Sequence, residues 1–235
     1  MELRASANSW LLWNPQRLDQ IEPWQFDAHQ WQQRGLLQAT PGGRGGSHFI
    51  SHAGGDWVVR HYCRGGLIGK LVRDRYLFTG LKQSRVYREF ALLEQMRALG
   101  LPVPVPLAGR LQRHGLLASA DLITERVAGA RDWVSWLLEA PLEHGLWREL
   151  GRLIARFHRH GIWHADLNLR NILLDGQGQL YLIDFDRGQQ RSPAQQWQAD
   201  NLARLRRSCL KEAAKTPAIH FADSAWLALL QGYQD

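Results

Sequence analysis

The sequence contains little cysteine, no long apolar run and no internal repeat. The two cysteines among its 235 residues, Cys63 and Cys209, form no CxxC pair and have no zinc-type spacing. This scarcity argues against a disulfide scaffold and is typical of a reducing compartment. No apolar run approaches the length of a membrane span. We therefore expect a protein of the cytosol, or one that sits on a membrane face without crossing it.

Acidic residues are also in deficit, because 22 aspartates and glutamates face 29 lysines and arginines and the net charge is +7. Such an excess indicates an anionic partner, which is a nucleic acid, an acidic lipid or a phosphorylated substrate. Seven of the basic residues lie in the segment 64–88, which contains a single acidic residue, Asp74. They are Arg64, Lys70, Arg73, Arg75, Lys82, Arg85 and Arg88. We favour recognition of an anion there, although a nucleic-acid surface has a similar composition. For a second basic group on a late helix we predict a solvated face: Arg204, Arg206, Arg207 and Lys211.

The start of the chain is rich in tryptophan and proline, and we expect residues 1–26 to be irregular. Trp10 and Trp13 enclose a short apolar run, too short for a signal peptide. These two side chains are either core residues or contacts with a membrane interface. Asp27 is expected to cap a short helix that ends at Gly35.

The hydrophobic pattern changes from strand-like to helical near residues 127–130. Before this point we predict a helix ending at Gly100 and strands at 48–52, 57–62, 107–112 and 116–125. After it we predict helices around 133–137 and 146–160, short strands at 172–174 and 180–183, and further helix from Trp197. A β-rich front and an α-rich back indicate an α+β fold with two lobes. We assign residues 1–30 to an N-terminal extension, 31–128 to an N-lobe and 129–235 to a C-lobe.

The most informative pattern is the segment 164–171, His-Ala-Asp-Leu-Asn-Leu-Arg-Asn, followed by an apolar run and Asp184-Phe185. Phosphoryl transfer from ATP needs one aspartate beside the attacking hydroxyl and two oxygen ligands for Mg²⁺. Asp166, Asn171 and Asp184 supply that set in the required order. Because two ordered motifs are more specific than a lone one, we favour this interpretation over a polar loop between strands. We predict Asp166 as the catalytic residue and Asn171 and Asp184 as the metal ligands.

Other positions have both a nucleotide-binding and an ordinary structural interpretation. The turn containing Gly43 and Gly45 either brings backbone N–H groups to a phosphate or is a hairpin loop. Arg60 either pairs with the phosphates of a nucleotide or is a solvated strand residue. Glu89 either holds Arg60 in place or is a surface carboxylate. Glu125, at the expected seam of the lobes, either begins a segment whose backbone meets an adenine or ends a strand.

Four motifs resemble the family of 3-deoxy-D-manno-octulosonic acid (Kdo) kinases, which are lipopolysaccharide-core kinases within the protein kinase-like superfamily. They lie at residues 60–67, 74–80, 164–175 and 183–188. The first two are specific to this family, and the last two are shared with the wider superfamily. The similarity extends from about residue 42 to about residue 208 and so covers most of the chain.

The resemblance implies a protein kinase-like fold and transfer of the ATP γ-phosphate to the 4-hydroxyl of Kdo on a lipid A precursor. It implies ATP and Mg²⁺ as cofactors, and a peripheral position on the cytoplasmic face of the inner membrane of a Gram-negative bacterium. Kdo carries a carboxylate and lipid A carries phosphates, so Lys70, Arg73 and Arg75 are candidates to face the acceptor. We expect no nucleic-acid partner and no obligate protein partner.

The chain departs from the protein-kinase pattern in three places. Arg60 stands where protein kinases carry lysine, and a planar guanidinium requires rearranged contacts to the phosphates. Asp186 replaces the glycine of Asp-Phe-Gly, and no Ala-Pro-Glu follows. These departures argue against protein substrates. Two other functions remain open: a related core kinase acting on heptose, and a non-catalytic basic module that binds RNA.

Overall fold

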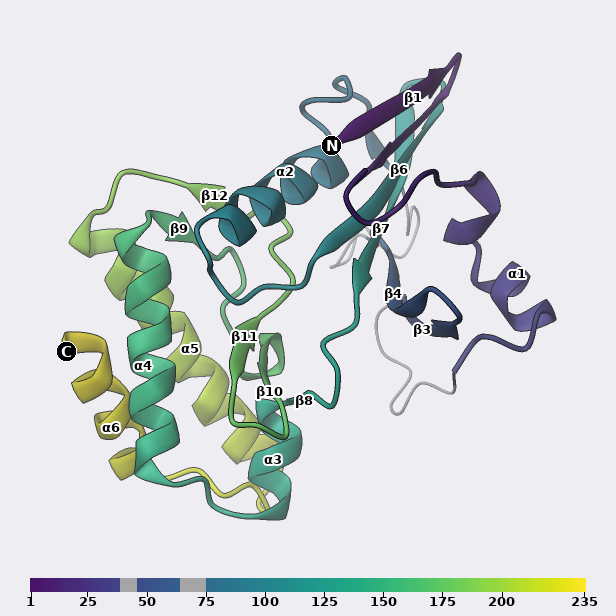
Figure 1. The fold of residues 1–235 in the computed structure, drawn as a ribbon. Helices are drawn as coiled ribbons and strands as arrows, with labels where there is room; N and C mark the ends of the chain where they lie inside the picture. The colour runs from purple at the N-terminus through teal and green to yellow at the C-terminus, as the bar shows by residue number, and fades with distance from the viewer. Residues whose placement is uncertain (39–45, 64–74) are drawn as a thin grey trace. The chain divides into compact units, whose positions relative to one another are not determined.

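The computed structural model describes residues 1–38, 46–63 and 75–235, and these form two compact units. Unit 1 consists of Met1–Gln95 and Pro104–Arg126, and unit 2 consists of Met96–Val103 and Val127–Asp235. The largest sheet belongs to unit 1, and most of the long helices belong to unit 2 (Figure 1). The mixture confirms the α+β class. Within the described ranges, no helix combines the length and the apolar character that crossing a membrane requires.

Unit 1 is built on an antiparallel sheet with the strand order β1-β2-β6-β7-β4-β3, and β5 also pairs with β7. The strands are β1 Glu2–Ser6, β2 Ser9–Trp13, β3 Ser47–His52, β4 Gly55–His61, β5 Tyr76–Leu77, β6 Pro106–His114 and β7 Leu117–Glu125. The hairpin of β3 and β4 confirms, to within two residues at each end, the strands expected at 48–52 and 57–62. β7 lies between β4 and β6, so its two neighbours satisfy the hydrogen-bonding groups along both of its edges.

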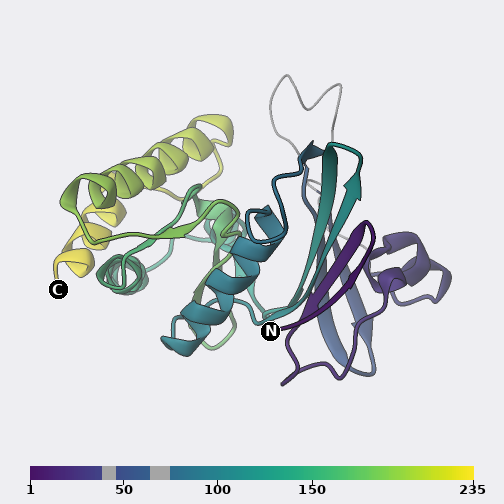
Figure 2. The same cartoon turned by 90° about the horizontal axis from the view of Figure 1, so that it is seen from above.

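Helices cover both faces of this sheet (Figure 2). The 3-10 helix η1 Pro23–Phe26 and the helix α1 Ala28–Gln33 place Phe26 and Trp31 against Trp57 and Val59 of β4 in one buried cluster. Asp27 caps α1 as expected, because its Oδ1 accepts from the backbone of His29 at 2.9 Å.

The other face of the sheet carries α2 Arg85–Ala98, most of which belongs to unit 1. This helix approaches β6 closely at Gly109. A Cβ on Gly109 would lie 2.6 Å from Cγ2 of Val86. A larger residue at position 109 would therefore push the helix away from the sheet.

The expectation that residues 1–26 are irregular is wrong, because β1 and β2 form a hairpin that extends the sheet beside β6. Leu11 and Leu12 point to opposite faces of the sheet and both are buried, at 4% and 0% exposure. A strand covered on both faces lacks the alternation of apolar and polar residues that reveals a strand in a sequence. The four-residue apolar run from Trp10 to Trp13 therefore gave no periodic signal.

Unit 2 is dominated by helices packed on each other. They are α3 Trp133–Glu139, α4 His144–Arg159, α5 Gln195–Lys215 and α6 Asp223–Gln234, with a 3-10 turn η3 Leu169–Asn171. Where α4 meets α6, a Cβ on Gly151 would lie 2.0 Å from the carbonyl oxygen of Leu229, and one on Gly232 would lie 2.0 Å from that of Arg148. Side chains at these two glycines would therefore drive the helices apart.

Short strands complete unit 2: β8 Arg131–Asp132, β9 Ile162–Trp163, β10 Ile172–Leu174, β11 Leu180–Leu182 and β12 Gln189–Gln190. They form one sheet in the order β11-β10-β8 and one pair of β12 with β9. The predictions of a helix at 146–160 and of strands at 172–174 and 180–183 are confirmed to within two residues at each end. The segment 164–171 thus begins directly after β9 and ends at the start of β10.

Candidate active site

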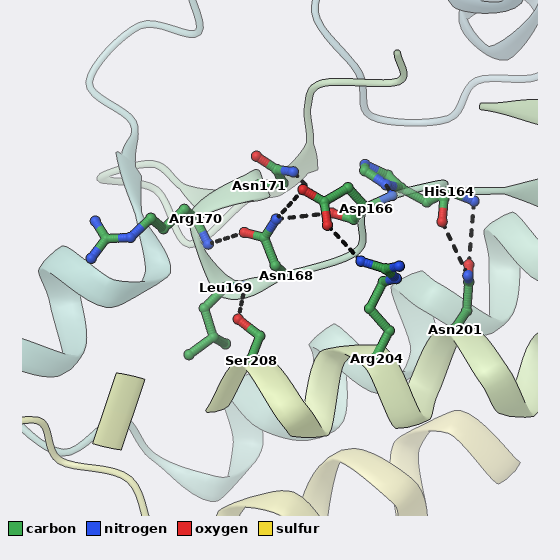
Figure 3. Close-up of polar contacts among 9 residues, drawn as sticks. All are labelled: His164, Asp166, Asn168, Leu169, Arg170, Asn171, Asn201, Arg204 and Ser208. Atoms are coloured by element: carbon green, nitrogen blue, oxygen red, sulfur yellow. Dashed lines mark hydrogen bonds and ion pairs between the residues drawn. The ribbon is translucent and has the colours of Figure 1, made fainter. Parts of the chain in front are cut away.

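His164 organises the segment 164–171 (Figure 3). Its ring is 3% exposed, accepts from the backbone N–H of Asp166 at Nδ1 (3.1 Å) and donates from Nε2 to the carbonyl of Ile183 (2.9 Å). A ring that accepts at one nitrogen and donates at the other is neutral. Burial lowers the pKa of His164, which agrees with that state. The ring thereby links the backbone of Asp166 to that of Ile183, the residue before Asp184.

Asn171 joins the same network from η3. Its Nδ2 donates to the carbonyl of Asp166 at 2.9 Å, and its own carbonyl accepts from the backbone of Ile183 at 3.0 Å. Hydrogen bonds of the backbone, the Asn171 amide and the imidazole therefore link Asp166 and Asn171 to Ile183, the residue that precedes Asp184, within unit 2. Asp166 remains open to solvent with its side chain 60% exposed.

Asp184 has a left-handed backbone conformation, with φ at +62°. Aspartate tolerates this region better than most residues with a Cβ. The following residue, Phe185, is fully buried, stacks on Phe157 at 5.8 Å between ring centroids, and lies 4.6 Å from the ring of His164. The buried phenylalanine thus anchors the chain, while the exposed Asp184 carboxylate is presented next to it.

The side chains of Asn171 and Asp184 suit a magnesium ion. The amide nitrogen of Asn171 is occupied by the Asp166 carbonyl, so its amide oxygen is the atom that remains for a cation. An amide oxygen and a carboxylate are hard ligands of the kind Mg²⁺ prefers, and one or two protein ligands suffice when phosphates supply others. The described residues contain no group of three or more His, Cys, Asp or Glu that could hold a metal by themselves. With its remaining ligands supplied by a phosphate substrate, an ion would find suitable oxygen donors in Asn171 and Asp184.

The helix α5 holds this loop through a row of four polar side chains whose contacts the sequence did not predict, and Figure 3 shows three of them, Asn201, Arg204 and Ser208. Asn201 is 3% exposed and bonds both backbone groups of His164, accepting from its N–H at 3.2 Å and donating to its carbonyl at 3.0 Å. Ser208 accepts from the backbone of Leu169 at 3.2 Å. Glu212 accepts two hydrogen bonds from Arg170, at 3.2 and 2.9 Å, and this contact lowers the pKa of Glu212.

Arg204 completes the row and overturns a prediction from the sequence. Its Nη1 donates to Oδ1 of Asp166 at 2.8 Å, so the expectation of a merely solvated helix face is wrong for this residue. The error arose because the partner lies 38 residues earlier in the chain. The available signal was the spacing of the polar residues 201, 204, 208 and 212, which recur every three or four positions along the side that also carries the buried Leu205.

In unit 1, the structure brings Arg60 and Glu89 together. Nη2 of Arg60 in β4 lies 2.5 Å from Oε1 of Glu89 in α2, with the two side chains 19% and 2% exposed. The hydroxyl of Tyr62 donates to the other carboxylate oxygen at 2.6 Å. Glu89 is therefore a buried partner of Arg60 and not a surface carboxylate. Contact of Arg60 with a nucleotide stays a prediction.

The remaining candidates are less informative. Glu125 is the last residue of β7, and its carboxylate lies 3.5 Å from the guanidinium of Arg17. Arg75 is exposed just before β5. Gly43, Gly45, Lys70 and Arg73 lie outside the described residues. The binding roles assigned to all of these positions stay predictions.

Comparison with known proteins gives consistent matches. Residues 28–233 match the model of a family described as "Lipopolysaccharide kinase (Kdo/WaaP) family". The chain is 39% identical over 234 residues to a protein of Photobacterium profundum, covering 100% of this chain and 98% of that protein. It is 40% identical over 243 residues to a protein of Actinobacillus succinogenes, covering both completely, and 45% identical over 185 residues to one of Vibrio cholerae, covering 79% of this chain and 78% of that protein. All three relatives are named 3-deoxy-D-manno-octulosonic acid kinase.

Proposed function

This chain belongs to the lipopolysaccharide kinase (Kdo/WaaP) family, and from this membership we propose that it transfers the γ-phosphate of ATP to the 4-hydroxyl of Kdo on a lipid A precursor. It is a phosphotransferase with a protein kinase-like fold, and it acts as a Kdo kinase in the synthesis of the lipopolysaccharide inner core. The observation that supports the proposal is the hydrogen-bonded set of Asp166, Asn171 and the residue before Asp184, within the region that matches the family.

The chemistry follows from these three side chains. The hydroxyl oxygen of the acceptor attacks the γ-phosphorus, the bond from that phosphorus to the bridging oxygen breaks, and ADP leaves. Asp166 orients the hydroxyl and accepts its proton, because its carboxylate is exposed while its backbone is held by His164. Asn171 and Asp184 would hold Mg²⁺, which when bound offsets the charge on the phosphate oxygens.

The acceptor also accounts for the charge of the chain. Kdo contributes a carboxylate and lipid A contributes phosphates at a membrane surface, whereas the protein carries a net charge of +7. Basic side chains close to such a surface are attracted by about 1 kcal/mol each. We therefore place the working enzyme on the cytoplasmic face of the inner membrane, with the segment containing Lys70, Arg73 and Arg75 toward the acceptor.

The direct test is mass spectrometry of a Kdo-containing lipid A precursor after incubation with ATP, Mg²⁺ and the purified protein. We expect the acceptor to gain one phosphoryl group, and phosphorus NMR to locate it on the 4-hydroxyl of Kdo. Transfer to a heptose-containing acceptor alone would contradict the assignment of substrate. Steep salt-dependent binding of RNA without ATP turnover would contradict the assignment as an enzyme.

Two neighbouring aspartates test the metal site. We expect Asp184→Ala to abolish Mg²⁺-dependent transfer, because its carboxylate is a proposed ligand of the ion. Asp186→Ala should have a milder effect. Asp175 accepts backbone hydrogen bonds from Gln177 and Gln179 in the turn between β10 and β11, so Asp175→Ala serves as a control that stays active. Equal loss from Asp184→Ala and Asp186→Ala in folded proteins would mean that the ligand is wrongly assigned.

A further inference from the structure

The four polar residues of α5 do not all contact the same part of the loop, and Figure 3 shows the contacts of three of them, Asn201, Arg204 and Ser208. Asn201 and Ser208 bond to backbone groups of His164 and Leu169, and Glu212 bonds to the side chain of Arg170. These three contacts fix the position of the loop relative to α5. Arg204 instead contacts a carboxylate oxygen of Asp166, the group to which we assign the proton transfer.

Asp166 is held at both of its carboxylate oxygens. Arg204 donates to Oδ1 at 2.8 Å, and Nδ2 of Asn168 donates to Oδ2 at 3.1 Å. The terminal torsion of an aspartate is otherwise broad, so a lone exposed carboxylate would turn freely. Donors to both oxygens fix the plane of the carboxylate, and each oxygen keeps a further lone pair for another hydrogen bond.

We propose that Arg204 is a positioning residue for catalysis, which orients the Asp166 carboxylate toward the hydroxyl of the acceptor. This proposal rests on the proposed function, in which Asp166 accepts the proton of that hydroxyl. A reacting group held in a productive geometry accelerates transfer, and small misplacements are costly. Removal of the Arg204 guanidinium should therefore lower the rate of transfer rather than the affinity for ATP.

The high solvent exposure of the Arg204–Asp166 pair supports a role in catalysis rather than in folding. The side chains of Arg204 and Asp166 are 46% and 60% exposed. Ion pairs this open to water contribute little to stability, because solvent screens the attraction and two side chains lose freedom. The loop itself is held by the buried Asn201, so the fold does not depend on Arg204.

The first experiment compares kinetics of Arg204→Gln, Arg204→Lys and the control Arg207→Gln. Arg207 is exposed on the same helix, so its substitution removes the same charge without touching Asp166 in the wild-type arrangement. We expect Arg204→Gln to lower kcat about tenfold, the scale of one charge-assisted hydrogen bond, with KM for ATP and the unfolding midpoint nearly unchanged. Arg204→Lys should recover part of the loss, because a lysine supplies charge but not the planar fork. Arg207→Gln should behave like the wild type.

The second experiment is a double-mutant cycle with Asp166→Ala. If Arg204 acts through Asp166, then Arg204→Gln should cause no further loss of the residual turnover in the Asp166→Ala background. A full additional tenfold loss there would overturn the proposal, since Arg204 would then act on something else. A rise in KM for the acceptor with unchanged kcat would also overturn it, by placing Arg204 on the acceptor.

The two experiments separate this proposal from the proposed function. A wild-type protein without transfer to any acceptor would contradict the function itself. An active wild type in which Arg204→Gln and Arg207→Gln have equal kcat would leave the function standing and contradict the role of Arg204.

Discussion

Each unit contains an arginine–carboxylate pair whose residues we predict or propose to take part in the reaction, and the two pairs differ in their exposure to solvent. In unit 1, Arg60 and Glu89 are 19% and 2% exposed and lie between a strand and a helix. In unit 2, Arg204 and Asp166 are 46% and 60% exposed and lie between a helix and a loop. The distances are similar, at 2.5 and 2.8 Å, so burial is the main difference.

The difference in burial corresponds to two roles for an arginine–carboxylate pair, one in stabilising the fold and one in presenting a carboxylate to a substrate. A buried carboxylate requires its partner, because an unpaired charge in the interior is strongly unfavourable. Glu89 is therefore part of the fold of unit 1, whatever else Arg60 contacts. An exposed carboxylate is already stabilised by water and remains accessible to a substrate. In the proposed mechanism Asp166 accepts a proton, and the loop around it is held by hydrogen bonds of other residues, among them Asn201 and His164.

The largest effect expected from this comparison is on turnover. Asp166→Asn should reduce kcat by at least about a hundredfold, the usual scale for loss of a general base, because an amide cannot accept the proton. The free energy of unfolding should hardly change, since Asp166 is exposed and an asparagine still accepts from Arg204. Steady-state kinetics together with urea unfolding would measure both quantities. Near wild-type kcat in a folded variant would remove Asp166 from its assigned role.

The candidate site of unit 2 could be located from the sequence because its residues lie close together in the chain. Asp166, Asn171 and Asp184 fall within two short motifs, and the chemistry of phosphate transfer fixes their types and order. Short-range periodicity also gave the helix α4 and the strands β10 and β11. In these regions the residues that determine the structure are close together in the chain.

The features that were missed depend on distant partners. Arg204 reaches a residue 38 positions earlier, and a single helix sequence cannot distinguish such a contact from a solvated arginine. The hairpin of β1 and β2 depends on β6, about a hundred residues later, and on cover over both faces of the sheet. For Glu89, the sequence left two interpretations equal, because its burial depends on how α2 packs against the sheet.

An intermediate effect is expected on stability when the buried pair is broken. Glu89→Gln should lower the free energy of unfolding by about 3 kcal/mol, the lower end of the range for a broken buried ion pair, because Arg60 is partly exposed. Glu94→Gln on the same helix is the matched control. Its carboxylate lies 3.3 Å from the terminal amine of Met1 at a more open position, so we expect a loss below about 1 kcal/mol. Equal losses from the two variants would mean that burial does not distinguish the pairs.

The smallest expected effect is a loss of stability at acidic pH. It extends the comparison from the ion pairs to a buried neutral histidine of unit 2. His158 on α4 is 2% exposed and lies 2.7 Å from the Tyr233 hydroxyl, and burial lowers the pKa of His158 to about 4. In the unfolded chain the same ring has a pKa near 6.5. As the pH falls below about 6.5, the ring takes up a proton in the unfolded state but not in the folded state. The free energy of unfolding therefore decreases until the pH reaches about 4, where the folded state binds the proton as well.

Between pH 7.5 and 5.5 this one histidine should remove about 1 kcal/mol from the free energy of unfolding. Burial also lowers the pKa of His164, so its contribution has the same sign. We expect His158→Gln to reduce the loss over this interval by about 1 kcal/mol, because glutamine does not titrate. His29→Gln, at an exposed position of α1, is the control and should retain the full pH dependence. Urea unfolding at the two pH values measures the difference, and an unchanged pH dependence in His158→Gln would show that acid destabilises the protein elsewhere than at this buried ring.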